Sequence, residues 1–193
     1  MTIAIDQDLV RRAVRRDPDA TATLLAQVRP GLVRYCRARL GRVGGAYATA
    51  DDVAQEVCLA LLGALPKYRD QGRPFTAFVY GIAAHKVADA QRSAVRDAVV
   101  APVEHVVERP DAAPGPEQQA VSTDLARRLC GLLGRLTETQ REIVLLRVAV
   151  GLSAEEVGDV VGLSAAAVRV AQSRALARLR SIAGDELGEV SAA

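Results

Sequence analysis

Apolar residues recur at steps of three and four along most of this chain, which is the spacing of a helix with one buried face. In the first half, this pattern predicts helices over residues 6–16, 17–40, 51–65 and 74–100. Pro30 and Gly31 interrupt the second of these helices, so we expect a kink or a division there. The first half is therefore expected to form an all-α domain over residues 1–99.

Residues 137–180 contain the sharpest helix boundaries in the chain. The segments 137–140 (TETQ) and 153–156 (SAEE) each form a capping box, which marks a helix start. Gly151 and Gly162 are expected to end the two helices, because glycine adopts the left-handed conformation without penalty. A third, arginine-bearing helix is capped by Ser164 and expected to end near Gly184. A short helix, a tight Gly-Leu-Ser turn and a longer helix form a helix-turn-helix, whose second helix normally enters the major groove of DNA.

The segment between these two parts has a different composition. Residues 101–117, APVEHVVERPDAAPGPE, hold four prolines and four acidic residues against one arginine. This composition predicts an extended, mobile, acidic linker over residues 100–118. Beyond it, a leucine stripe is expected to pack on the helix-turn-helix: Leu125, Leu129, Leu132, Leu133 and Leu136. We thus expect a second all-α domain over residues 119–184 and a disordered tail over residues 185–193.

The third helix of the second domain has two distinct faces. The residues expected to pack inward are Val168, Ala175, Leu176 and Leu179, with Leu163 at the turn. The residues of the opposite face are Ser164, Ala165, Ala166, Arg169, Val170 and Ser173, flanked by Arg174 and Arg178. Short side chains at its start allow a close approach to DNA, an arginine fits a guanine edge, and a valine fits a thymine methyl group. The N-terminal amides and flanking arginines suit phosphates. An ordinary three-helix bundle with a solvated arginine face has the same pattern, so both interpretations stay open.

The predicted helix 51–65 is polar only in its first half. The polar residues there are Asp51, Asp52, Gln55 and Glu56, and residues 57–65 are apolar almost all round. A helix that is apolar on every side must be buried, either inside its own domain or against another protein. Burial inside the domain is the more frequent case.

The predicted helix 74–100 has a basic stripe beside its core stripe. The core residues are Phe75, Phe78, Val79, Ile82, Ala83, Val87, Ala90 and Ala94. The other face holds His85, Lys86, Asp89, Arg92 and Arg96, near Tyr80 and the loop of Tyr68. Aromatic and cationic groups together suit single-stranded nucleic acid. A solvated face with pairs such as His85 and Asp89 explains the same residues.

Composition narrows the class of protein without identifying it. The chain has 193 residues, 50% of them hydrophobic but only 3% aromatic, which favours helices over a sandwich or a barrel. The formal charge of +2 does not demand a nucleic-acid partner. Only two of the 25 basic residues are lysines, which suits phosphate and base recognition but also follows from a GC-rich genome.

Three widely spaced cysteines, Cys36, Cys58 and Cys130, form no zinc or disulfide pattern, so we expect buried thiols in a reducing cytosol. We find no signal peptide, no run long enough to span a membrane, and no phosphate loop or catalytic motif. A soluble intracellular protein with no metal, cofactor or enzymatic activity is expected.

Three segments together resemble the extracytoplasmic-function (ECF) sigma factors, the two-domain initiation subunits of bacterial RNA polymerase. They are ADDVAQEVCLALLGAL at 50–65, RPFTAFVYGIAAHKVADAQR at 73–92, and the helix-turn-helix at 136–180. The second segment is most similar to an actinobacterial subgroup related to sigma factor D. The resemblance spans nearly the whole chain.

This resemblance implies roles for particular residues. Docking on the clamp helices of the polymerase β′ subunit would involve Asp51, Asp52, Gln55, Glu56 and Leu59. Recognition of the minus-ten element, with one extruded base held by the 68–73 loop, would involve Tyr68, Arg69, Arg73, Phe78, Tyr80, His85, Lys86, Asp89 and Arg92. The helix-turn-helix face from Ser164 to Arg178 would read the minus-thirty-five element, while other surfaces of that domain meet the β flap. The acidic linker would thread the RNA channel, and an anti-sigma factor would hold the chain inactive.

Two departures from the family pattern affect base preference. Phe78 stands where a tryptophan is common, and Val170 and Ala171 stand where polar or basic residues are usual. Two alternatives to a sigma factor are considered. A stand-alone helix-turn-helix regulator with a helical sensor or dimerisation domain would leave the linker and helix 51–65 without a purpose. A helical enzyme or adaptor lacks any catalytic constellation.

Overall fold

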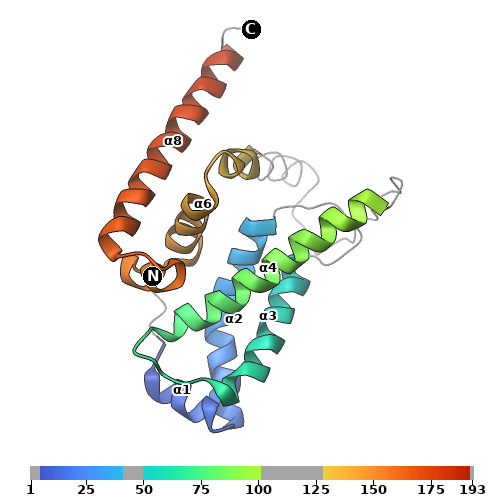
Figure 1. Cartoon of the computed structure of the whole chain (residues 1–193), viewed down its shortest axis with the longest axis vertical. Helices are drawn as coiled ribbons and strands as arrows, with labels where there is room; N and C mark the ends of the chain where they lie inside the picture. The colour runs from blue at the N-terminus through green and yellow to red at the C-terminus, as the bar shows by residue number, and fades with distance from the viewer. Residues whose placement is uncertain (1–4, 41–49, 101–127, 192–193) are drawn as a thin grey trace, which may run out of the picture.

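The structure, a computed structural model, describes residues 5–40, 50–100 and 128–191, and the side chains of residues 97–100 and 185–191 are not described. The N-terminal half contains α1 (Gln7–Val14), α2 (Pro18–Leu40), α3 (Ala50–Ala64), the 3₁₀-helix η1 (Leu65–Lys67) and α4 (Phe75–Val100). The C-terminal half contains a helix over 128–134, then α6 (Glu138–Val144), the π-helix η2 (Leu145–Val150), α7 (Ala154–Val161) and α8 (Ala165–Ser191). Figure 1 shows the arrangement of these helices. The described residues form no strand, and the predicted all-α class is confirmed.

Helix α2 runs through Pro30 as one element, so the expected division did not occur. Proline removes the hydrogen bond to the carbonyl four residues earlier, here that of Ala26. Ala26 and Pro30 both lie on the exposed side of α2, where water can satisfy that carbonyl. On the other side Leu24, Val28 and Leu32 are buried, and this packing holds the two halves of the helix together.

The start of α2 is fixed by Asp17. Its Oδ1 accepts hydrogen bonds from the backbone N–H groups of Asp19 and Ala20, both at 3.0 Å. Arg12, in α1, lies 2.7 Å from its other carboxylate oxygen. The Ala20 amide and then Arg12 lower the pKa of Asp17, because they stabilise its charged form.

Helix α3 is not buried all round within its own domain, so the more frequent of the two alternatives, internal burial, does not hold for its whole apolar half. Val53, Val57 and Leu61 are buried against α2 and α4, whereas Leu59 is 61% exposed and Leu62 is 37% exposed. The N-terminal domain provides one buried face for α3 and leaves its opposite face to solvent. The less frequent alternative, an apolar surface directed at another molecule, is consistent with this arrangement.

The helix-turn-helix forms with the predicted boundaries. Both capping boxes are present, and Gly151 and Gly162 have positive φ angles of 91° and 74°. Gly158 was not predicted to matter, yet a Cβ atom there would lie 2.5 Å from the backbone oxygen of Leu163. The turn can close tightly only because α7 has no side chain at this position.

Other details of the C-terminal half differ from expectation. Leu163 is 40% exposed and Leu129 is 52% exposed, although both were expected to pack inward; Leu133 and Leu136 are buried as predicted. Helix α8 does not end at Gly184 but continues to Ser191, where a disordered tail was expected. Residues 101–127, which include Leu125 and all of the predicted linker 100–118 except its first residue, lie outside the described residues.

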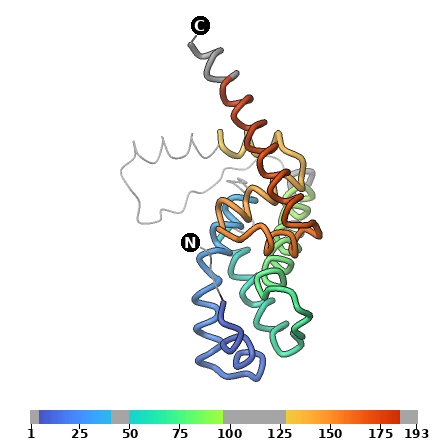
Figure 2. The backbone as a smooth tube through the Cα atoms, turned by 90° about the vertical axis from the view of Figure 1, so that its left-hand side faces the viewer, coloured from blue at the N-terminus to red at the C-terminus, as the bar shows by residue number. Residues whose placement is uncertain are grey.

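The two halves share one hydrophobic core. Val10, Leu32 and Val79 of the first half belong to the same buried cluster as Leu146 and Val157 of the second half. Contacts join α2 to η2 and α4 to α7, and the side view in Figure 2 shows the C-terminal helices lying against the N-terminal ones. None of the helices in the described part of the chain is long and apolar enough to span a bilayer.

Candidate nucleic-acid and protein interfaces

The start of α8 presents the surface that the sequence predicted for DNA. Ser164 caps the helix by accepting a hydrogen bond from the Ala167 amide at 3.2 Å. The exposed residues are Ser164, Ala166, Arg169, Val170, Ser173, Arg174 and Arg178, whereas Ala165 is half-buried against the core. Arg169 forms an ion pair with Glu155 of α7, so its guanidinium must leave Glu155 before it can contact a base.

This surface is supported from behind by packing and by one arginine. Val168 and Ala175 are fully buried beneath it. Arg147, from η2, donates one hydrogen bond to Gln172 Oε1 of α8 at 3.0 Å and another to the Leu152 carbonyl. Arg147 therefore connects α8 to the turn that joins η2 and α7. No periodic signal in the sequence marks this role, since the contact depends on the π-helical geometry of η2.

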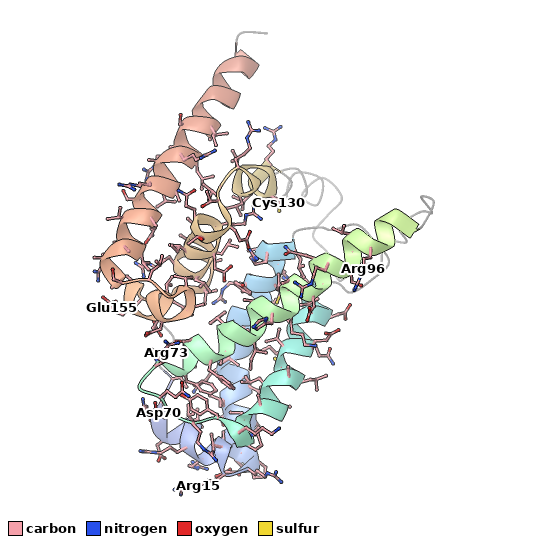
Figure 3. All side chains as sticks on the ribbon, in the orientation of Figure 1. Arg15, Asp70, Arg73, Arg96, Cys130 and Glu155 are labelled. Atoms are coloured by element: carbon pink, nitrogen blue, oxygen red, sulfur yellow. The ribbon has the colours of Figure 1, made fainter. Side chains whose placement is uncertain are left out.

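The basic stripe of α4 is only partly available. His85, Asp89 and Arg92 are exposed, and Arg92 pairs with Asp89 in place of the pair expected between His85 and Asp89. Lys86 Nζ lies 3.2 Å from Glu56 Oε2 of α3. Figure 3 labels Asp70 and Arg73 in the loop that precedes α4, and Arg96 toward the far end of the helix. The stripe thus occupies the second half of α4, with Lys86 held by the neighbouring helix.

A pocket of about 220 Å³ lies between α1 and the 68–73 loop. Its apolar lining includes Val10, Tyr68 and Phe75, and its polar lining includes Gln7, Arg11 and Arg69. Tyr68, Phe75 and Phe78 form an aromatic cluster with ring centroids 4.9–5.8 Å apart. Asp70 Oδ1 accepts the Gly72 amide at 2.9 Å, which shapes the loop. A pocket lined by apolar and aromatic side chains together with a few polar ones is the kind of site that can hold a planar, hydrogen-bonding group.

Tyr80 is not on the exposed face. It is 3% exposed and packs edge-on against Tyr35 of α2, with ring centroids 5.6 Å apart. Burial raises the pKa of Tyr80. In this arrangement Tyr80 is part of the core and is not available to contact DNA.

The exposed face of α3 carries every residue that the sequence singled out there. Asp51, Asp52, Gln55, Glu56 and Leu59 are all exposed, and Leu62 extends the same face. Arg37 contacts both carboxylate oxygens of Asp51, at 2.9 and 2.7 Å, and this contact lowers the pKa of Asp51. The result is a surface that is acidic at its N-terminal end and apolar at its C-terminal end.

Comparison with protein families identifies both halves. Residues 24–97 match the model of sigma-70 region 2, and residues 132–181 match the model of sigma-70 region 4. The matched ranges cover α2 to α4 and the helix-turn-helix. The fold and these surfaces thus define a two-domain sigma factor.

The chain is also similar to individual sigma factors. It is 54% identical over 178 residues to the ECF RNA polymerase sigma factor ShbA of Streptomyces griseus, covering 91% of this chain and 93% of that protein. It is 56% identical over 172 residues to the ECF RNA polymerase sigma factor SigD of Mycobacterium tuberculosis, covering 89% and 81% respectively. The structure of CnrH in complex with the cytosolic domain of CnrY is similar with a TM-score of 0.68 at 26% identity, covering 93% of this chain and 97% of that one.

The chain belongs to the extracytoplasmic-function sigma factors of bacterial RNA polymerase. Sigma domains 2 and 4 bind core RNA polymerase and promoter DNA, so this chain directs transcription initiation from specific promoters. These findings favour a sigma factor over a stand-alone regulator.

Proposed function

We propose that this chain docks on core RNA polymerase through the exposed face of α3, reads the minus-ten element with α4 and the 68–73 loop, and reads the minus-thirty-five element with the start of α8. The domains that carry these tasks would span residues 1–99 and 119–184, joined by the acidic linker. The observation that carries the docking role is the unpartnered apolar end of α3, at Leu59 and Leu62.

The α3 face has the features of a protein-binding surface. Leu59 and Leu62 are apolar side chains left in water, and they gain free energy when a partner covers them. The nearby carboxylates of Asp52 and Glu56 would attract a basic surface and orient the partner. Glu56 also pairs with Lys86, so the docking helix and the minus-ten helix are linked electrostatically.

The docking role is tested with a matched pair of variants. Leu59→Arg is expected to weaken binding to core RNA polymerase at least tenfold in fluorescence anisotropy. Val95→Arg, at a position 67% exposed on another face of the same domain, is expected to bind normally. Both variants should retain the native circular dichroism spectrum. Normal polymerase binding by folded Leu59→Arg would refute the docking role of α3.

The pocket beside the 68–73 loop would receive an unstacked base of the minus-ten element. Tyr68 and Phe75 would contact the base plane, and polar groups at the rim would contact its edge. Arg73, His85 and Arg92 would contact the displaced strand. Lys86 would also contact this strand if polymerase engaged Glu56 and so released the lysine. Phe78 would act through the aromatic cluster, and Tyr80 would take part only in a state in which it is no longer buried.

Membership of the same family also supports a proposal for how the chain is regulated and where it acts. CnrH was solved in complex with the cytosolic domain of CnrY, so a similar sigma factor is held by a protein partner. An anti-sigma factor is accordingly proposed for this chain. The chain would act in the cytoplasm with core polymerase and would have no catalytic activity of its own. Run-off transcription with core polymerase, followed by mapping of transcript 5′ ends, tests the proposal as a whole.

A further inference from the structure

Polar contacts join the two halves of the chain within the described residues, in addition to the shared hydrophobic core. Arg34 Nε donates to the Ala149 carbonyl at 2.7 Å, and Thr76 Oγ1 donates to Glu156 Oε1 at 3.1 Å. Tyr35 Oη donates to Glu142 Oε1 at 2.7 Å. Arg39 forms ion pairs with Glu138 and, at 3.6 Å, with Glu142. Each contact joins α2 or α4 to the segment from α6 to α7.

The contact between Arg39 and Glu142 is buried, unlike the surface ion pairs of this protein. The side chain of Arg39 is only 6% exposed and that of Glu142 is 13% exposed. Arg39 belongs to α2 and Glu142 to α6, so this buried ion pair crosses from one half of the chain to the other. Arg39 Nε and Nη1 have no hydrogen-bond partner within the described part of the chain. Removal of any one of Tyr35, Arg39 and Glu142 would therefore leave a buried polar or charged group without its partner, which is strongly destabilising for a buried charge.

The arrangement brings the two DNA-reading surfaces too close together to engage a promoter. By their names, the minus-ten and minus-thirty-five elements lie about 25 base pairs apart, or about 85 Å at roughly 3.4 Å per pair. In the structure, Thr76 at the start of α4 contacts Glu156 of α7, and the adjacent Glu155 contacts Arg169 of α8. Two side-chain contacts thus bridge surfaces that must reach separate DNA segments.

We propose that the free chain is latched shut by its own two domains, that the buried cluster of Tyr35, Arg39 and Glu142 is the latch, and that the latch must open when core polymerase binds. This inference rests on the proposed assignment of α4 and α8 to separate promoter elements. Opening would cost free energy because it exposes part of the shared core, and polymerase would compensate for this cost by covering the exposed face of α3. The chain thereby restrains its own binding before any second protein acts on it.

The latch is tested in the full-length chain by measuring the distance between the halves. Labels at Val95→Cys and the native, exposed Cys130, in a Cys58→Ser background, allow energy-transfer measurements on the free protein. Arg39→Met is expected to increase the separation and to raise the affinity for core polymerase about tenfold, because a larger fraction of the chain is then competent to bind. Tyr35→Phe, which removes one hydroxyl, should shift both quantities in the same direction but less. Arg12→Ala, which breaks an ion pair confined to the N-terminal half, should change neither.

A double variant separates loss of the latch from loss of the fold. Arg39→Met with Glu142→Leu replaces the buried charges by apolar groups and is expected to restore the short distance and the weaker polymerase affinity. An unchanged distance in Arg39→Met, or an open wild-type chain, would overturn the proposal. Opening without any gain in polymerase affinity would also overturn it. These distances are measured without polymerase, so they are independent of the Leu59→Arg test.

Discussion

Gly158 offers a sharp test of how the helix-turn-helix closes. In Gly158→Ala the new methyl carbon would lie 2.5 Å from the Leu163 carbonyl oxygen, a backbone atom that cannot rotate away. The Gly158 carbonyl accepts hydrogen bonds from the amides of Gly162 and Leu163, at 2.8 and 3.0 Å. Relief of the clash therefore has to displace the turn and strain both hydrogen bonds.

The expected loss of stability can be worked out from these contacts. Overpacking of this kind costs about 1–3 kcal/mol, and two weakened hydrogen bonds, each worth about 1 kcal/mol, add to that loss. Alanine recovers about 1 kcal/mol through its higher helix propensity. We expect a net loss of about 2 kcal/mol, which lowers Tm by about 4–8 °C in a chain of this size.

The assay is thermal and denaturant unfolding followed by far-UV circular dichroism. Gly63→Ala is the matched control, since Gly63 also lies within a helix but has no atom within 4 Å of the added methyl position. This control is expected to be stabilised by up to about 1 kcal/mol. If Gly158→Ala were stabilised to the same extent as Gly63→Ala, the proposed close approach of α7 and the turn would be refuted.

Three further predictions address the caps, the thiols and base recognition. Asp17→Ala should lower the free energy of unfolding at neutral pH. The pKa of Asp17 is lower in the native than in the unfolded chain, so its stabilising contribution is present above the unfolded pKa and is lost as the pH falls through the native pKa. The free energies of unfolding of variant and wild type should therefore converge in acid. A thiol reagent should modify exposed Cys130 first and Cys36 last, as followed by mass spectrometry, because burial raises the pKa of Cys36 to about 12. Early labelling of Cys36 would contradict its burial. Arg169→Ala is expected to weaken binding by about 1–3 kcal/mol at one promoter position, whereas Arg178→Ala should weaken all sequences alike in gel-shift assays; equal, sequence-blind losses would remove Arg169 from base reading.

Local features of this fold could be predicted from the sequence. Thr137 and Ser153 begin helices because a capping box satisfies backbone amides within one turn, whatever the rest of the chain does. The exposed face of α8 followed from helical spacing alone. For Pro30 the sequence left a kink and a division open, because the effect of the proline depends on whether water reaches the freed carbonyl, and that depends on which side of α2 faces solvent.

Features that depend on distant residues could not be predicted in this way. Tyr35 and Glu142 are separated by 107 positions, and no local pattern indicates that they meet. Arg39 was indistinguishable from other arginines of the same segment. Tyr80 looked available because its packing against Tyr35 joins two helices that are distant in the sequence. Helical spacing left open whether the apolar half of α3 is buried inside its own domain or against another protein, and only the resemblance to sigma factors assigned Leu59 to a docking surface.

The π-helix η2 has a consequence for how sequences of this kind can change in length. Its wide turn, in which the Gly151 amide bonds to the Leu146 carbonyl, accommodates one more residue than an α-helix of the same rise. Deletion of exposed Val148 would let the segment return to an ordinary α-helix, and the residues on either side of it would keep their orientation. A deletion within α2 would instead rotate every later side chain by about 100°. Natural insertions and deletions in this half of the chain are therefore expected to be concentrated between Leu145 and Val150.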